Sequence, residues 1–239
     1  MLKLHRLIKR AAAAAFLLLA ATGPLPAFER GDLDRLRQTG TCPECDLSEI
    51  DLADIALQRT NLIDSGWRPL DLSGADLRGA RLRQAPFSRA TLRGAKLAGA
   101  ELDQADLRRA DLRDTDLTGA SLVGANLSAA RLDAANLTGA VLRQATLDGT
   151  RLNGAILVQA DLERAILTRA SLNGADLSGA RLPGAFLSET DLYAAKLDGT
   201  DLSGADLSSA QGLTQVQLDR ACGSDATSLP RWLVLRPCD

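Results

Sequence analysis

Four cysteines are the residues of this chain with the most evident chemistry. Cys42 and Cys45 form a C-x-x-C pair, and Cys222 and Cys238 lie near the other end of the 239-residue sequence. A C-x-x-C pair can be a disulfide, a redox-active dithiol or half of a metal site. Zinc usually takes four nitrogen or sulfur ligands, and the only histidine, His5, is distant from both pairs in the sequence. The pattern favours structural disulfides and leaves redox and metal roles as alternatives.

Beyond the cysteines, no arrangement of residues predicts catalysis. Histidine is the most frequent general base in enzymes, and His5 lies in a segment that we expect to be removed. Serine and aspartate are abundant, as at Asp71 and Ser73, but they recur at fixed positions of a repeat. No glycine-rich loop joins a predicted strand to a helix in the manner of a phosphate-binding site. We therefore expect no enzymatic activity, cofactor, metal or small-molecule substrate.

The elements that position these residues follow a five-residue repeat. Leucine occupies 31 of the 33 positions spaced by five from Leu47 to Leu207, and Trp67 and Phe87 occupy the other two. Two residues before each centre, alanine fills 23 of the 27 sites between positions 75 and 205, and threonine fills the rest. The unit therefore reads A-[D/N/R/T]-L-x-x.

Neither an α-helix nor a flat strand can bury such a repeat along one side. Five residues turn a helix by about 500°, so successive leucines would spiral around every face. On a strand, side chains five residues apart point to opposite faces. The leucines can share one interior only if the chain bends within each unit. Each pentapeptide is therefore predicted to form one short side of a closed coil.

The distribution of glycine indicates four units in each coil. Two residues after the central position, six of the eight sites spaced by twenty from 59 to 199 are glycine, against one of the nine sites from 49 to 209. Glycine here allows a corner with positive φ. Trp67 and Phe87 are also twenty residues apart, so we expect them to stack. The units then make about eight coils, and the rod is roughly 40 Å long at a spacing of about 4.8 Å.

Across residues 46–210 the unit resembles the pentapeptide repeat family. The resemblance implies an all-β solenoid, a right-handed quadrilateral β-helix, with leucine along its axis and alanine or threonine in its corners. The first coils are expected to be less regular, with a bulge over residues 65–69, because other residues fill the small site there: Cys45, Ile50, Ile55, Thr60, Ser65 and Leu70. The C-x-x-C before the first repeat also resembles the leading segment of many exported members.

Residues 1–27 are typical of a secretory signal peptide. Four basic residues precede an apolar stretch at 11–21, which is short for a membrane span, and Ala27 marks the expected cleavage site. A retained membrane anchor is the alternative. Cleavage removes four basic residues and leaves 24 against 30 acidic ones, a net charge of −6. We expect a periplasmic or secreted protein.

The two ends are predicted to be caps. Residues 28–45 contain the C-x-x-C and a short helix over 32–38 with Leu33 and Leu36 on one face. Residues 211–239 contain a helix over 215–222, which begins with a capping-box pattern at Thr214–Gln217. The tail that follows is expected to pack back through its apolar side chains: Trp232, Val234 and Leu235. Dimerisation through this end is the alternative, so monomer and homodimer both stay open.

Export makes disulfides the default for the four cysteines. The two pairs lie at opposite ends of a rod of roughly 40 Å, whereas a disulfide needs Cα atoms within about 7 Å. The predicted bonds are therefore Cys42–Cys45 and Cys222–Cys238, and the second closes a 17-residue loop.

Specificity must then come from outward side chains. The candidate interaction patch for an unknown protein partner is apolar, and its two members twenty residues apart should stack: Ile156, Val158, Ile166, Phe186 and Tyr193. Some members of the family protect DNA gyrase by imitating the acidic surface of duplex DNA. Arginines interrupt the acids here, so such mimicry, or any nucleic-acid partner, is the less favoured interpretation. Membrane contact is expected only if the N-terminal segment is retained. We interpret the chain as an exported structural or interaction module.

Overall fold

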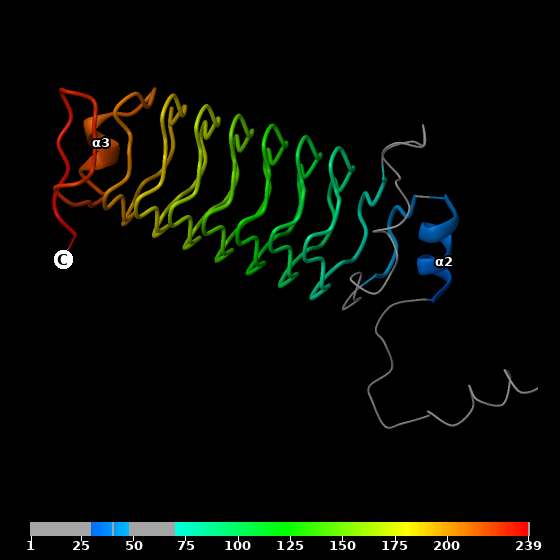
Figure 1. Ribbon diagram of the computed structural model, residues 1–239. Coiled ribbons are helices and arrows are strands. Elements are labelled where there is room, and N and C mark those ends of the chain that lie inside the picture. The colour runs from blue at the N-terminus through cyan, green and yellow to red at the C-terminus, as the bar shows by residue number, and fades with distance from the viewer. Residues whose placement is uncertain (1–29, 40, 48–69, 239) are drawn as a thin grey trace, which may run out of the picture.

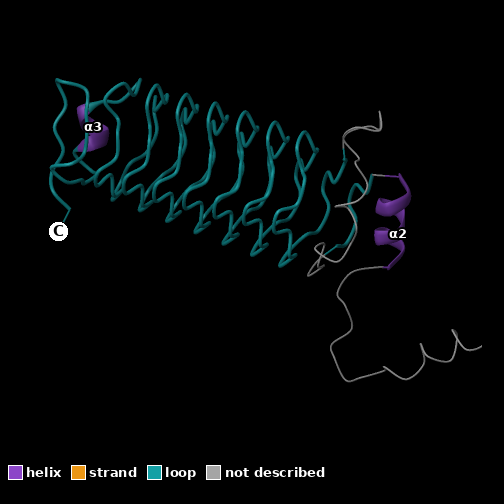
Figure 2. Cartoon of the chain, viewed as in Figure 1, coloured by secondary structure: helices purple, strands orange, loops and turns teal. Residues whose placement is uncertain are grey.

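A rod of stacked coils with a helix at each end is the architecture of the chain (Figures 1 and 2). The computed structural model describes residues 30–39, 41–47 and 70–238. Helix α2 spans Arg30–Thr39 and helix α3 spans Gln215–Leu218. Neither helix in this part of the chain has the length and apolarity needed to cross a membrane. The expected signal peptide, the bulge at 65–69, Trp67 and the side chain of Leu33 lie outside the described residues.

Parallel pairing between residues twenty apart builds the coils. Within residues 70–211 each coil pairs with the next at four positions, as in Asp71 with Thr91 and Asp76 with Lys96. Four pairings in each coil correspond to the four predicted sides. The pairings are isolated bridges, because two residues of every unit form a turn. The described coils therefore pair as a β-helix without forming extended strands.

One unit shows how the sequence produces this geometry. The amide of Leu77 donates to the carbonyl of Lys96 in the next coil at 2.7 Å, and the leucine side chain is fully buried. The chain then turns, and the amide of Ala80 donates back to the carbonyl of Leu77 at 3.1 Å. Gly79, the third turn residue, has a φ of 63°, as a type II turn requires. The prediction of positive φ at this position is confirmed.

The interior is a column of leucine flanked by alanine. The buried polar residues of the described coils are four threonines, whose hydroxyls all donate to main-chain carbonyls. Thr150, for example, donates to the carbonyl of Leu127 at 2.7 Å. Threonine can therefore replace alanine in the core without leaving its hydroxyl unpaired.

The first coil departs from the twenty-residue period. Thr41 pairs with Asp71 and Asp46 with Asp76, so equivalent residues are thirty apart there. The ten additional residues lie between 47 and 71. They equal two pentapeptides, so the leucine phase runs on unbroken although the coil is longer, and a uniform twenty-residue period is wrong at this end. The pairing also begins at Thr41, five residues before the expected start of the repeats.

The C-terminal cap differs from its predicted form. The capping box at Thr214 and Gln217 is confirmed, but the helix ends at Leu218 rather than at 222. Cys222 instead pairs with Asp201 and continues the ladder with one residue added. The expectation that Trp232 and Val234 pack inward is wrong, since both are exposed. The residues of the tail that pack on the core are Leu229, Leu233 and Leu235.

Candidate functional site

The N-terminal disulfide is built into an ordinary corner of the solenoid. Cys42 and Cys45 are bonded, with their Cα atoms 5.4 Å apart, and both are fully buried. They occupy the leucine and alanine positions of one pentapeptide turn. The amide of Cys45 donates to the carbonyl of Cys42, and Glu44 has the positive φ of a third turn residue, 58°. The C-x-x-C therefore replaces a packed Leu/Ala pair at the N-terminal end of the core.

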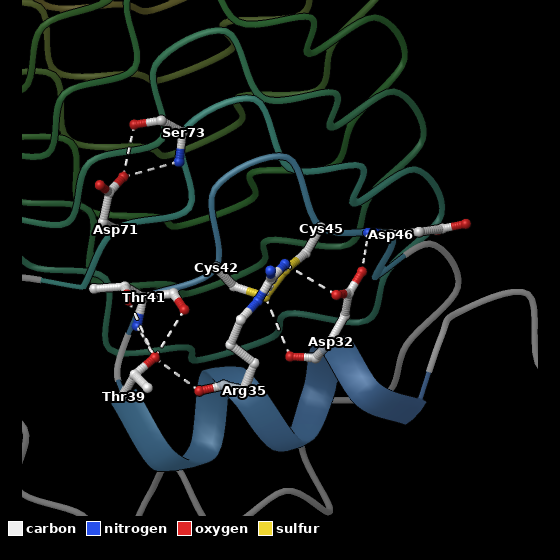
Figure 3. The surroundings of a disulfide bond; sticks show 9 residues. All are labelled: Asp32, Arg35, Thr39, Thr41, Cys42, Cys45, Asp46, Asp71 and Ser73. Carbon is white, nitrogen blue, oxygen red and sulfur yellow. Dashed lines mark hydrogen bonds and ion pairs between the residues drawn. A yellow bond between two sulfur atoms is a disulfide. The ribbon is translucent and has the colours of Figure 1, made fainter.

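Helix α2 lies across this corner and places charged side chains at the sulfurs (Figure 3). Nη2 of Arg35 is 2.6 Å from Sγ of Cys45 and 3.7 Å from Sγ of Cys42. The same guanidinium pairs with Asp32 at 2.9 Å. The other carboxylate oxygen of Asp32 accepts the amide of Asp46 at 3.0 Å. The expected contact of Leu36 is confirmed, because this side chain is 2% exposed.

A second disulfide, Cys222–Cys238, closes the C-terminal tail, with Cα atoms 4.8 Å apart. Each disulfide has one carboxylate close to its sulfurs, from Asp32 or Asp201, within 4.8 Å. Such a set resembles part of a metal site. Metals bind cysteine as the thiolate, and among the described residues each set offers only one carboxylate in addition to its sulfurs. In the bonded state neither cluster supplies the four ligands that zinc takes.

Most outward aspartates and asparagines serve the turns rather than a ligand. The carboxylate or amide oxygen before the leucine accepts the backbone amide two residues later. Asn126 accepts from both the amide and the hydroxyl of Ser128, at 3.0 and 2.6 Å. Asp176 binds Ser178 in the same way. The repeated polar residues are thus structural, as the sequence suggested for Asp71 and Ser73, which form the same contact.

The ionisable groups have the properties of structural ion pairs. Hydrogen bonds from Arg78, Arg108 and Arg113 lower the pKa of the preceding carboxyl groups, at Asp76, Asp106 and Asp111. Hydrogen bonds from Ser178 and Ser208 likewise lower the pKa of Asp176 and Asp206. A general acid at neutral pH needs the opposite shift, so these carboxyls are not suited to acid catalysis.

Arginine also neutralises acids between coils. Nε of Arg143 is 2.7 Å from Asp161, and Nη1 of Arg181 reaches the same carboxylate at 3.2 Å. Arg169 binds Asp148 at 2.7 Å. These pairs interrupt the acidic surface along the rod.

The five residues of the predicted patch lie on different sides of the coil. Ile166 pairs directly with Phe186, so these two stack as expected, and they are 38% and 52% exposed. Ile156 pairs with Asn136 and Asp176 on the side two units away. Val158 belongs to that same unit, and Tyr193 lies on a third side. The structure therefore brings together only Ile166 and Phe186.

Sequence reasoning missed an apolar group at the C-terminal end. Val216, Trp232 and Val234 are the most exposed large apolar residues in the described part of the chain, at 71–79%. The side chain of Gln215 joins α3 to the tail, with two hydrogen bonds to the backbone of Val234 at 3.0 and 3.1 Å. Leu233 and Leu235, which alternate with Trp232 and Val234 in the tail, pack against the core instead. Alternation along the tail after residue 231 could have indicated this arrangement.

These features define a leucine-centred solenoid with four five-residue sides to a coil. A sequence profile described as pentapeptide repeats matches residues 71–208 in overlapping segments, with eight copies. The match covers more than half of the chain, and the protein belongs to the pentapeptide repeat family. A search among curated protein sequences found no significant match.

Solved structures of the same family are similar to the chain. HetL, a pentapeptide repeat protein involved in heterocyst differentiation regulation in the cyanobacterium Nostoc sp. strain PCC 7120, is 31% identical, with 84% of this chain and 90% of HetL covered and a TM-score of 0.48. A trypsin-treated variant of QnrB1, a plasmid-mediated fluoroquinolone resistance protein, is 16% identical, with coverages of 80% and 92% and a TM-score of 0.58. A thylakoid-lumen protein of Arabidopsis thaliana is 29% identical, with coverages of 50% and 82% and a TM-score of 0.27.

Proposed function

We propose that the protein is a non-enzymatic, rigid structural or protein-interaction module that works after export to the periplasm or the cell exterior. Pentapeptide repeat proteins are generally structural or interaction modules. The proposal includes a right-handed rod of about eight coils with a short helical cap at each end. Its localisation rests on the signal-like residues 1–27.

The observation that carries the proposal is the stacked pair Ile166 and Phe186. Repeated outward polar residues are engaged in turns and ion pairs, and these two apolar side chains break that pattern on one side of the rod. An exposed aromatic residue on a rigid support is typical of a binding hot spot. Arg164, an exposed residue of the preceding unit, forms no ion pair with any carboxylate in the described part of the chain.

A matched pair of variants tests this surface. Ile166→Ser with Phe186→Ser should leave the thermal melt within about 2 °C and abolish cross-linking to a periplasmic partner. Ile156→Ser with Val158→Ser makes the same chemical change two sides away and should preserve the cross-link. Equal cross-linking by both double variants would exclude the Ile166–Phe186 surface. Intact mass of the native protein tests export, with a chain that starts at Phe28 as the expected result.

Imitation of DNA toward gyrase is the second candidate. The likeness to QnrB1 concerns the fold, and the Arg–Asp pairs along the rod argue against a continuous acidic surface. Long-range attraction to a DNA-binding enzyme requires a coherent field of one sign. We expect no inhibition of gyrase supercoiling by micromolar mature protein, and inhibition in that range would favour mimicry instead. A membrane-tethered scaffold would follow if the intact mass retained residues 1–27.

A further inference from the structure

The backbone holds Cys42 and Cys45 together without help from their bond. The corner that contains them has the turn hydrogen bond and positive φ of its neighbour in the next coil, where Leu72 and Ala75 are not bonded. Their side chains point into the same interior, so the fold fixes the distance between the sulfurs. A loop of this length also gains the least from cross-linking in the chain-entropy model. The bond can therefore open while the corner stays folded.

The second disulfide has a different setting. Cys222–Cys238 closes a tail of 17 residues, and its partners are 16 apart in sequence rather than three. A longer loop gains more stability from its cross-link. The two disulfides thus differ in role: Cys222–Cys238 stabilises the C-terminal tail, whereas the N-terminal bond contributes little to the stability of the fold.

Arg35 makes the two sulfurs of the N-terminal bond unequal. Its guanidinium is 2.6 Å from Sγ of Cys45 and 3.7 Å from that of Cys42. A cation beside a cysteine favours its thiolate, and a stabilised thiolate is the better leaving group in disulfide exchange. Asp32 acts in the opposite sense, because its carboxylate lies within 4.8 Å of both sulfurs.

We propose that Cys42–Cys45 is a thiol–disulfide exchange site whose reductant is a dithiol. One thiolate of the reductant attacks Sγ of Cys42, the sulfur–sulfur bond breaks, and its electron pair leaves on Sγ of Cys45 as a thiolate beside Arg35. The second thiolate of the reductant then attacks the reductant sulfur that is bonded to Sγ of Cys42. The mixed disulfide breaks, and Cys42 leaves as a thiolate that takes a proton. The reductant departs as a disulfide, and the protein has gained two electrons.

Helix α2 controls access to this site. Both cysteines are fully buried and α2 lies against their disulfide, so movement of α2 would expose Cys42 to a reductant. The helix is held there by Leu36, by the hydrogen bond that the amide of Asp46 donates to Asp32, and by Thr39, whose hydroxyl lies 3.0 Å from that of Thr41. Loosening these contacts should speed reduction without changing the corner itself.

The test is a redox titration of the full chain against dithiothreitol, quenched by acid and alkylation. Peptide mass spectrometry then reads the two cysteine pairs separately, so that Cys222–Cys238 serves as an internal reference. Arg35→Gln should lower the reduction potential of Cys42–Cys45 by about 30 mV, a tenfold change in the equilibrium constant. Asp32→Asn should raise the reduction potential and also accelerate reduction. Arg35→Lys should keep the equilibrium constant within threefold of its value in the unsubstituted protein.

The decisive result is a shift of the reduction potential of Cys42–Cys45 in opposite directions in Arg35→Gln and Asp32→Asn, because a purely structural role of the two side chains predicts no such shift. The proposal is overturned if Arg35→Gln and Asp32→Asn leave the equilibrium constant within twofold, or move it in one direction. It is also overturned if circular dichroism shows that the rod melts when only Cys42–Cys45 is reduced. Should a variant fail to fold, the rate and equilibrium of reduction of the unsubstituted chain decide: reduction only in denaturant overturns the proposal.

Discussion

The side-chain amide of Gln217 donates from Nε2 to the carbonyl oxygen of Ala195 at 2.8 Å. It also reaches the carbonyl of Leu192 at 2.9 Å, while its Oε1 accepts the amide of Thr214 at 2.8 Å. The last coil of a solenoid would otherwise leave carbonyls without a partner in the next coil. One side chain therefore completes both the N-terminus of α3 and the open edge of the rod.

Gln217→Ala should lower the free energy of unfolding by about 1–3 kcal/mol, because it leaves part-buried polar groups unpaired. Chemical denaturation followed by circular dichroism measures the change. Gln211→Ala is the matched control, since this exposed glutamine forms hydrogen bonds to Thr190 and Leu192 through its backbone, which the substitution keeps. Equal stability of the two variants would show that the cap does not depend on Gln217.

Adjacent alanines should respond to the same substitution with opposite signs. Ala134 is the third turn residue, with a φ of 58°, whereas Ala135 is a fully buried corner residue outside the positive-φ set. A left-handed conformation costs an L-residue about 1–2 kcal/mol, and glycine avoids that cost. Ala134→Gly should therefore stabilise the rod by up to about 1 kcal/mol after the entropy of glycine is included.

Ala135→Gly should destabilise the rod by about 1–2 kcal/mol, since it removes a buried methyl group and adds backbone freedom. Thermal melts of the two variants, made in parallel, check the order. A lower melting temperature for Ala134→Gly than for Ala135→Gly would contradict the assignment of strain to the third turn residue.

Acid should weaken the rod below about pH 4. The pKa values of Asp76, Asp106 and Asp111 are lowered in the fold from their ordinary value of 3.8, chiefly by hydrogen bonds from arginine. Groups with a lowered pKa stabilise the fold above the unfolded value, and that contribution disappears as the pH falls through the folded value. Melts between pH 7 and pH 5 should therefore change little, and those from pH 4 to pH 2 should decline.

Asp106→Asn should reduce this decline. The equivalent residue one coil on, Asn126, accepts the backbone amide two residues later without carrying a charge, as Asp106 does from Arg108. The substitution therefore keeps this turn contact and removes one ionisable group. The comparison is made as the difference in melting temperature between pH 7 and pH 3. An unchanged or steeper difference would show that Asp106 does not contribute to acid sensitivity.

The sequence was sufficient to predict what depends on the five-residue period. Leu137 is buried, Gly139 has positive φ, and Ile166 stacks on Phe186 because each lies twenty residues from its equivalent. The longer first coil was not predictable from the same signal, since ten added residues preserve a phase of five. Thirteen of the 27 third turn residues from 74 to 204 are not glycine, so glycine marks this position only in part.

The sites at the two ends were less predictable, because they depend on contacts between segments distant in the sequence. The C-x-x-C spacing identified a disulfide but not the guanidinium of Arg35 or the carboxylate of Asp32, which α2 brings to it. Likewise, the capping box predicted that α3 begins at Gln215, directly after Thr214, but not that it ends at Leu218. After α3 the parallel pairing resumes, with Cys222 against Asp201, and this pairing replaces the helix that was predicted to continue to residue 222.

The corner that holds the N-terminal disulfide should be transferable along the rod. Leu132 and Ala135 have the same relation as Cys42 and Cys45: the amide of Ala135 donates to the carbonyl of Leu132 at 3.0 Å, and the third turn residue has a φ of 58° in both corners. Leu132→Cys with Ala135→Cys should therefore form a disulfide upon air oxidation of the folded protein, because the backbone already sets the required geometry.

The measurement is alkylation of the oxidised protein followed by peptide mass spectrometry, with few free thiols expected at either position. Leu132→Cys with Asn136→Cys is the control, since residue 136 takes part in the outward-facing ladder and should leave both thiols free. Shortening the leucine to cysteine opens a cavity, so the reduced double variant should melt below the unsubstituted protein. Free thiols in both oxidised variants would contradict the view that each corner holds its inward pair at disulfide distance.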